Sequence, residues 1–307
     1  MLSSDFTTRS ICPVCRSGNR RLALSSGVDD AVVADNISSA FSGYETWNHF
    51  FDFFRCEDCD LLYSTCYPTD GLLSELYREV AKNEVGQDGP ALDATHSWLA
   101  RKFVAPELSD GRTGLRVLEL GPDTGRFAAA LSRYVSSVHI DFVEPNVTAW
   151  EDLRRRFGDD VLVAASLAEL GQRPHYDVII AHHVFDHVPD ISGLMRALNT
   201  LTTGGSTLSI VVHNHRSMLR RLMRSKWPPF CLQHPHIFSR RSLRQLLEGC
   251  GWDVRVVRRQ VNYVGILATL NNLLGVFTGK RRGIPRRDVV VPVRFGNIGV
   301  IAQRRTG

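Results

Sequence analysis

The sequence predicts an α/β protein in which a doubly wound, Rossmann-like seven-stranded sheet follows a small N-terminal module. From Leu115 onward, short apolar runs alternate with helical patterns, as in the βαβ units of a parallel sheet. A glycine turn, Gly121 to Gly125, stands between the first of these runs and a helical segment. Two C-x-x-C pairs lie upstream of residue 60 and set the N-terminal region apart from the sheet.

The predicted elements follow one another with short connections. The polar segment 109–114 marks the entry to the sheet. We expect a module over residues 1–70, a helical lid or linker over 71–110 and the sheet domain over 111–307. Strands are expected at 116–119, 138–143, 161–164, 178–181, 207–212 and 252–258, with 289–293 and 297–303 as an antiparallel hairpin at the sheet edge. Helices are expected at 125–134, 147–157, 191–201 and 239–250.

Composition is that of a globular protein. Of 307 residues, 43% are apolar and 22% charged, which excludes disordered and fibrous classes. The net charge is +5, and basic residues gather in the last third of the chain. That bias could attract an anionic substrate, a membrane surface or nucleic acid, or form a solvated face. The basic residues there include Arg216, Arg220, Arg221, Arg224, Lys226, Arg240, Arg241, Lys280, Arg281, Arg282, Arg286 and Arg287.

The sequence contains no predicted export or membrane-spanning segment. Residues 1–10 lack the charged and apolar regions of a secretory signal. The apolar stretch 261–277 is interrupted by asparagines and is shorter than the ~20 residues needed to span a bilayer. We therefore expect a cytoplasmic protein, with peripheral membrane contact through the basic C-terminal third left open and no prediction of oligomeric state.

The glycine turn and a downstream acid predict a nucleotide-type cofactor site. Gly121 and Gly125 let the backbone approach a ligand at the carboxyl end of a strand. Glu144 ends the next strand, 19 positions beyond Gly125, where a carboxylate can accept hydrogen bonds from two ribose hydroxyls. Asp123 occupies the middle-glycine position of the dinucleotide fingerprint and would repel a pyrophosphate.

The segment from Val117 to Phe127 instead resembles motif I of the class I S-adenosylmethionine methyltransferases, with Glu119, Gly121 and Gly125 matching its acidic residue and glycines. The resemblance implies that Glu119 holds the methionine end of S-adenosyl-L-methionine and that Glu144 holds its ribose. Asp123 departs from the small residue usual at the middle position.

Two later segments extend the resemblance to about residues 95–260. Residues 176–190 resemble the family's fourth strand and the loop after it, with Asp186 and His187 in the place of a Glu-His pair. Residues 201–208 match the helix end, glycine turn and fifth strand. Ser166, in the loop that contacts adenine in the family, and His182 are further cofactor-binding candidates.

Cys12, Cys15, Cys56 and Cys59 form two C-x-x-C pairs separated by 40 residues. Two such pairs can fill the four positions of a tetrahedral Zn²⁺, which predicts a structural zinc-binding module. A redox role is the alternative, and the other three cysteines are expected to be isolated thiols.

This arrangement resembles the zinc-binding N-terminal region of a methyltransferase subgroup that includes enzymes of deoxysugar C-methylation and others of polysaccharide and natural-product pathways. The resemblance implies that the module and the helical segment 71–81, which bears Tyr77, form a lid over the substrate.

Histidines supply the candidate base. Imidazole has a pKa of ~6.5, which suits removal of a hydroxyl proton at neutral pH. We expect His187 to be that base, oriented by Asp186, with His234 or His236 positioning the acceptor from the opposite side.

The sequence therefore predicts an S-adenosylmethionine-dependent methyltransferase acting on a small molecule or glycan. We expect O-methylation of a sugar hydroxyl on an oligosaccharide or glycosylated metabolite, for instance of the mycofactocin type. The alternatives are C-methylation of a nucleotide-linked deoxysugar, O-methylation of a small aromatic or polyketide hydroxyl, and a catalytically degenerate zinc-containing binding protein. Nucleic acid is not an expected partner, since few aromatic residues interleave the basic ones.

Overall fold

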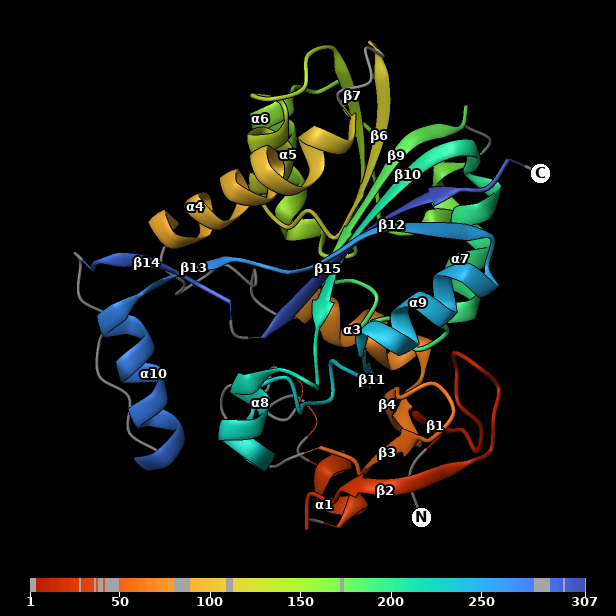
Figure 1. Ribbon diagram of the computed structural model, residues 1–307, viewed down its shortest axis with the longest axis vertical. Coiled ribbons are helices and arrows are strands. Elements are labelled where there is room, and N and C mark those ends of the chain that lie inside the picture. Colours follow the sequence, from red (N-terminus) through yellow and green to blue (C-terminus); the bar gives the residue numbers. More distant parts are fainter. Residues whose placement is uncertain are drawn as a thin grey trace.

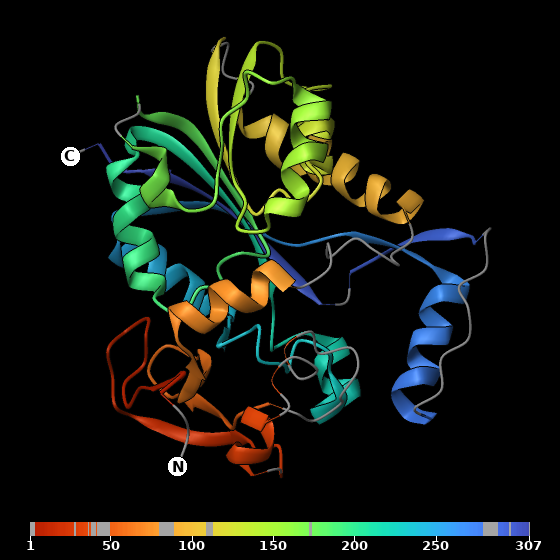
Figure 2. The ribbon, with the colours of Figure 1, turned by 180° about the vertical axis from the view of Figure 1, so that it is seen from behind.

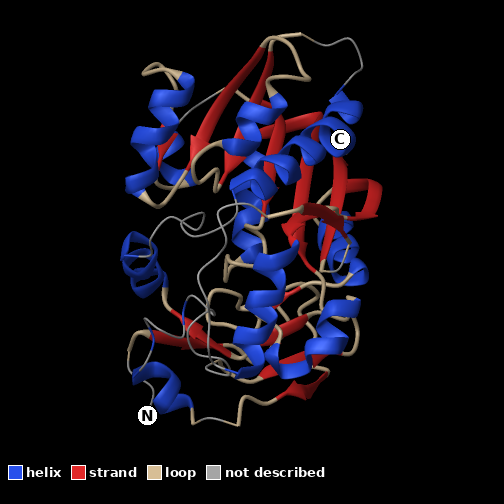
Figure 3. Cartoon of the chain, turned by 90° about the vertical axis from the view of Figure 1, so that its left-hand side faces the viewer, coloured by secondary structure: helices blue, strands red, loops and turns tan. Residues whose placement is uncertain are grey.

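The structure is a computed structural model that describes residues 4–27, 29–35, 37, 41, 50–79, 89–108, 113–171, 174–278, 288–294 and 296–306. A large sheet and a small N-terminal sheet occupy the upper and lower parts of the side view in Figure 3. Parts of three sequence predictions lie outside the described residues: the turn at 109–112, the helix end at 80–81, and the basic residues 280–282, 286 and 287.

The large sheet has seven strands in the order β12-β15-β10-β9-β6-β7-β8, which confirms the predicted doubly wound fold. All run parallel except β15, which is antiparallel to β10 and β12. The chain reverses direction across the sheet between β6 and β9, and such switch points are where open α/β sheets bind ligands. The strands are β6 (Leu115–Leu120), β7 (Val138–Val143), β8 (Val163–Ala164), β9 (Tyr176–His182), β10 (Thr202–His213), β12 (Trp252–Arg259) and β15 (Asn297–Arg304).

Helices cover both faces of this sheet because its strands are apolar on both faces (Figure 1). Val117 packs in one core cluster with α4 to α6, and its neighbour Leu118 in the other with α7 and α9. These helices are α4 (Gly89–Leu99), which continues as a π-helical turn Ala100–Val104 and a 3-10 turn Ala105–Leu108, α5 (Arg126–Leu131), α6 (Trp150–Phe157), α7 (Ile191–Thr200) and α9 (Arg240–Gly249).

The predicted hairpin at the sheet edge is wrong. β14 (Val290–Val293) pairs with β13 (Asn262–Gly265) in a separate two-stranded sheet. β15 instead enters the large sheet, since Ile298, Val300 and Ile301 are all buried and require cover on both faces. α10 (Ile266–Thr278) follows β13 and stands away from the sheet in Figures 1 and 2.

The N-terminal region forms a four-stranded sheet in the order β11-β4-β3-β2. Its edge strand β11 comes from the part of the chain that follows β10, so the module shares its sheet with the predicted sheet domain. In Figure 2, α3 lies between the N-terminal strands and the large sheet. The elements are β1 (Phe6–Thr8), β2 (Arg20–Leu24), α1 (Asp30–Asp35), β3 (Phe53–Cys56), β4 (Leu62–Ser64), β5 (Cys66–Pro68), α3 (Asp70–Glu79), α8 (Met218–Met223) and β11 (His236–Ile237).

Within the described residues, no helix is both long and apolar enough to span a membrane.

Candidate active site

The glycine turn follows β6 at the switch point of the sheet. Gly121 and Gly125 have φ of +63° and +74°, a region that L side chains rarely adopt. A Cβ on Gly125 would lie 2.6 Å from a ring carbon of Phe157 and 2.9 Å from Leu153 Cδ2, both on α6. Gly125 is therefore required by the packing of α6 as well as by the turn.

Glu144 follows β7 and braces this turn. Its carboxylate accepts hydrogen bonds from the backbone N–H of Asp123 at 3.0 Å and of Asn146 at 2.8 Å. Burial raises the pKa of Glu144 to about 7, although both backbone N–H groups act to lower it. The carboxylate thus lies at the carboxyl edge of the sheet with an ionisation that changes near neutral pH.

The other predicted cofactor residues lie on or directly after neighbouring strands. Glu119 is buried on β6, and Ser166 follows β8 and contacts Glu169 at 3.3 Å. His182 ends β9, with its Nε2 2.9 Å from Ser209 Oγ. Burial lowers the pKa of His182 well below its usual value, which leaves the ring neutral. Because parallel strands end at one edge, Ser166 and His182 lie at the same edge of the sheet as the glycine turn.

Asp186 pairs with His213, so the expected Asp186–His187 pair is not formed. The fully buried Asp186 Oδ2 accepts hydrogen bonds from the backbone N–H of His213 at 3.1 Å and from its Nδ1 at 2.5 Å. Burial alone would raise the pKa of Asp186, but the charge and hydrogen bond of His213 hold it well below the usual range. When the ring of His213 is neutral, donation by Nδ1 leaves the lone pair on Nε2.

His187 belongs to a different chain of hydrogen bonds. Its Nδ1 lies 3.0 Å from Tyr77 Oη and its Nε2 lies 3.2 Å from His234 Nε2. His234 Nδ1 donates to the carbonyl of Pro229 at 2.9 Å, so His234 Nε2 carries no proton while the ring is neutral. Burial lowers the pKa of both histidines. In this arrangement both nitrogens of His187 have protein partners.

His236 lies apart from this cluster. It is fully buried in β11, and its Nε2 donates to the carbonyl of Phe185 at 2.7 Å. Burial lowers the pKa of His236 to about 3, so it stays neutral. This hydrogen bond connects the module's sheet to the loop after β9, and the predicted role of His236 in positioning the acceptor stays a prediction.

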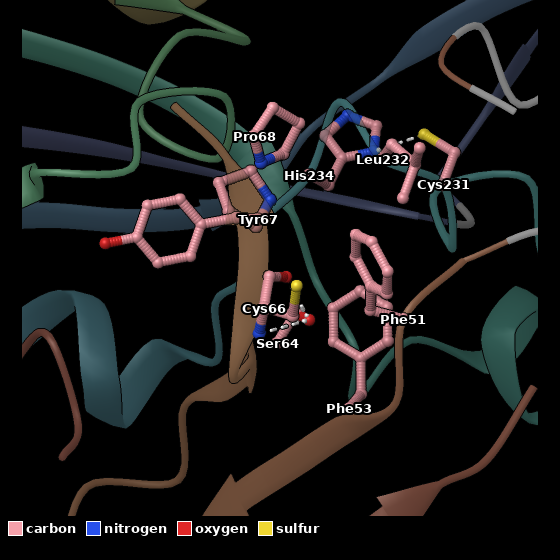
Figure 4. Close-up of a pocket in the computed structure, with 10 residues that line it drawn as sticks. Phe51, Phe53, Ser64, Cys66, Tyr67, Pro68, Cys231, Leu232 and His234 are labelled. Atoms are coloured by element: carbon pink, nitrogen blue, oxygen red, sulfur yellow. Dashed lines mark hydrogen bonds between the residues drawn. The ribbon is translucent and has the colours of Figure 1, made fainter. Parts of the chain in front are cut away.

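A small cavity separates the module from the loop that carries His234 (Figure 4). Cys231 and His234 are on one wall, joined by a contact of 3.2 Å between Sγ and Nδ1. The centre of a water molecule can reach about 10 Å³ of this cavity, which is room for one water. The cavity is therefore too small for an acceptor molecule.

The four predicted metal-binding cysteines lie together. Cys12 Sγ is 3.5 Å from Cys59 Sγ, and Cys15 Sγ is 3.4 Å from Cys56 Sγ. All four sulfur atoms lie within 4.8 Å of one another. This donor set and spacing fit a tetrahedral ion with Zn–S distances of ~2.3 Å.

The two C-x-x-C pairs are each followed by a residue with the same left-handed backbone conformation. The residues after the pairs, Arg16 and Asp60, have φ of +64° and +66°. Asp60 also accepts two hydrogen bonds from Arg216, at 2.9 and 2.7 Å, and its carbonyl is 2.7 Å from His215 Nε2. The second pair is therefore fastened to the loop that follows β10.

Sequence reasoning missed the pairing of His213 with Asp186. β10 lies beside β9 in parallel, with Val211 opposite His182. His213 therefore ends at the same edge as His182 and the loop bearing Asp186. The order of strands four and five in a doubly wound sheet was the signal that could have identified it.

A family of methyltransferase domains matches residues 95–257 of the chain. Similar solved structures include an O-methyltransferase family protein from Burkholderia thailandensis, at 11% identity over 78% of this chain and 61% of that one, with a TM-score of 0.46. The cyclase SpnF aligns at 15% identity over 75% of this chain and 86% of its own, with a TM-score of 0.48. A Bacillus halodurans C-125 protein assigned as a methyltransferase aligns at 12% identity over 66% and 97%, with a TM-score of 0.45. No curated protein matches the chain.

Proposed function

Because the chain belongs to this family of methyltransferase domains and is an S-adenosylmethionine-dependent methyltransferase, we propose that it methylates a hydroxyl group of a saccharide. The observation that carries the proposal is the Asp186–His213 pair at the carboxyl edge of the sheet. It orients an imidazole ring beside the switch point where the family's cofactor would bind.

The methyl donor fits the residues around the glycine turn. Gly121 has no room for a side chain without shifting Val184, whose Cγ2 would lie 3.2 Å from an added Cβ. Glu144 would accept the ribose hydroxyls, and Glu119, Ser166 and His182 would complete the site. When bound, S-adenosyl-L-methionine supplies an electrophilic methyl group on its sulfonium.

His213 is the proposed base. Asp186 holds its Nδ1–H and thereby orients Nε2 to accept the hydroxyl proton. The same carboxylate stabilises the imidazolium that forms. His187 is less suited to this step, since Tyr77 and His234 already occupy its two nitrogens, so we assign it and His234 a place in the wall of the acceptor site.

The chemistry of that wall favours a polyhydroxylated acceptor. His183 and His213 lie beside Asp186 and can hydrogen-bond hydroxyl groups, whereas the ring nitrogens of His187 and His234 are already paired within the protein. A site edged by these imidazoles would favour a methyl acceptor that carries hydroxyl groups, because an apolar acceptor would leave polar atoms of the protein unpaired. C-methylation of a nucleotide-linked deoxysugar and a non-catalytic binding role remain the alternatives.

We also propose that Cys12, Cys15, Cys56 and Cys59 hold one structural Zn²⁺. The closed four-thiolate set leaves no open position for catalysis. The hydrogen bonds of Asp60 with Arg216 then connect the metal site to the segment after β10, next to the proposed base His213. A compartment that keeps thiols reduced, such as the cytoplasm, suits this site.

The test is methyl transfer from labelled donor to a panel of oligosaccharides and nucleotide-linked sugars, with the product's methyl carbon assigned by NMR. An O-methyl product is expected, and a C-methyl product would replace the proposed reaction. His213→Ala should lower kcat by ~10²–10⁴ with donor affinity unchanged, whereas the exposed His175→Ala should keep full turnover. Full turnover by His213→Ala would refute its role as the base.

A further inference from the structure

A second group of metal-ligating side chains lies at the carboxyl edge of β9, away from the four cysteines. One ligand atom from each of Asp186, His187 and His234 lies within 4.8 Å of the others. The two imidazole Nε2 atoms are 3.2 Å apart. Two nitrogens bound to one tetrahedral ion at ~2.0–2.1 Å lie about 3.3–3.4 Å apart, so this separation suits a shared ion.

Each of the three side chains is held by an outer partner through one polar atom. Tyr77 Oη lies 3.0 Å from His187 Nδ1, and the Pro229 carbonyl lies 2.9 Å from His234 Nδ1. His213 occupies Asp186 Oδ2. Metal-binding histidines and carboxylates in proteins are oriented by such outer hydrogen bonds. The atoms left for coordination are His187 Nε2, His234 Nε2 and Asp186 Oδ1.

Asp186 Oδ1 distinguishes a metal site from a hydrogen-bond network. A direct bond from His187 Nε2–H to His234 Nε2 would satisfy both imidazoles without any ion. That bond would still leave Asp186 Oδ1 unsatisfied, because this oxygen is fully buried and has no hydrogen-bond partner among the described residues. A buried carboxylate oxygen without a partner is costly, and a cation would remove that cost.

We infer that Asp186, His187 and His234 bind one divalent transition-metal ion, separate from the four-cysteine cluster. Two imidazoles and one carboxylate suit zinc, iron and neighbouring first-row ions. The second possible group, His183 with Asp186 and His213, is less suited, because His213 Nδ1 and Asp186 Oδ2 are joined to each other. Three protein ligands leave an open position, as in catalytic sites.

The ion gives the proposed methyl transfer a way to activate the acceptor, and this step rests on the proposed function. The acceptor hydroxyl occupies the open position, where the cation lowers its pKa. Its O–H bond breaks and the proton passes to His213 Nε2. The oxygen then forms the new bond to the methyl carbon, while the electron pair of the methyl–sulfur bond stays on sulfur. Asp186 links the ion to the base, because one of its oxygens faces the ion and the other accepts the hydrogen bond from His213.

The experiment counts metal in the full chain purified without chelator, by elemental mass spectrometry, and then titrates the chelator-stripped protein with Co²⁺. We expect about two ions per chain in the wild type and about one in His187→Ala and His234→Ala. In those variants the thiolate-to-cobalt absorption of the cysteine site should persist, which also reports that the module is folded. His175→Ala, an exposed histidine, should retain both ions.

One ion in the wild type, or two ions retained in both variants, would overturn the inference. Neither result depends on the methyl acceptor, because no turnover is measured. Conversely, absence of methyl transfer in protein that holds both ions would count against the proposed function and leave the metal site standing.

Discussion

Replacing Gly125 with alanine should destabilise the fold at a point that the structure defines closely. An alanine at φ +74° costs about 1–2 kcal/mol for the left-handed backbone. The new Cβ would also lie 2.6 Å from Phe157 and 2.9 Å from Leu153, and overpacking of this kind costs about 1–3 kcal/mol. The two contributions together predict a loss of roughly 2–5 kcal/mol, a large part of a typical stability of ~5–15 kcal/mol.

Urea unfolding of the chain, followed by tryptophan fluorescence, measures this loss. Gly114→Ala is the control, because Gly114 has a similar φ of +68° and nothing within 4 Å of an added Cβ. It should lose only the backbone contribution. Adding Phe157→Ala to Gly125→Ala should cost less than the sum of the single changes, since the clash is removed. Equal losses for Gly125→Ala and Gly114→Ala would refute the packing argument.

The remaining predictions concern the donor and the cysteine site. Because burial raises the pKa of Glu144 to about 7, its carboxylate is ionised above that pH and protonated below it, so affinity for S-adenosylmethionine should fall as pH drops from about 8 to about 6. Calorimetry would measure the affinity at each pH. Glu144→Ala should bind S-adenosylmethionine ~1–3 kcal/mol more weakly, and its affinity should depend less on pH. If the variant's affinity varies with pH as that of the wild type does, Glu144 is not part of the donor site. Cys56→Ser should lose one zinc ion and unfold at a lower urea concentration. Cys250→Ser, at an isolated thiol, should keep its metal. Equal metal content in both variants would count against the four-cysteine site.

The sequence predicted the elements whose signals are local. Gly121 and Gly125 marked a turn between a strand and a helix, and the structure has β6 and α5 on either side. The C-x-x-C spacing predicted that four sulfur atoms would gather, as they do. Backbone conformation and short ligand spacing are set by neighbouring residues, so one sequence was sufficient for both.

Contacts between segments far apart in the chain could not be predicted from local sequence patterns. Asp186 and His187 are adjacent in the chain, yet Asp186 bonds to His213, 27 residues away, because β9 and β10 end side by side. Likewise β15 reads as an edge strand by its position after β14, but its buried side chains place it between β10 and β12. Strand order and side-chain direction determine such contacts, and a local sequence pattern predicts neither of them.

The position of β15 has a consequence for how the protein is made. Residues 297–304 fill the gap between β10 and β12, so both strands keep unpaired edges while the ribosome is still producing the preceding 296 residues. Exposed strand edges recruit other chains, and a nascent protein in this state is prone to aggregation. The sheet therefore cannot be completed until translation has passed β15, and a chain interrupted before residue 297 lacks the strand that joins β10 to β12.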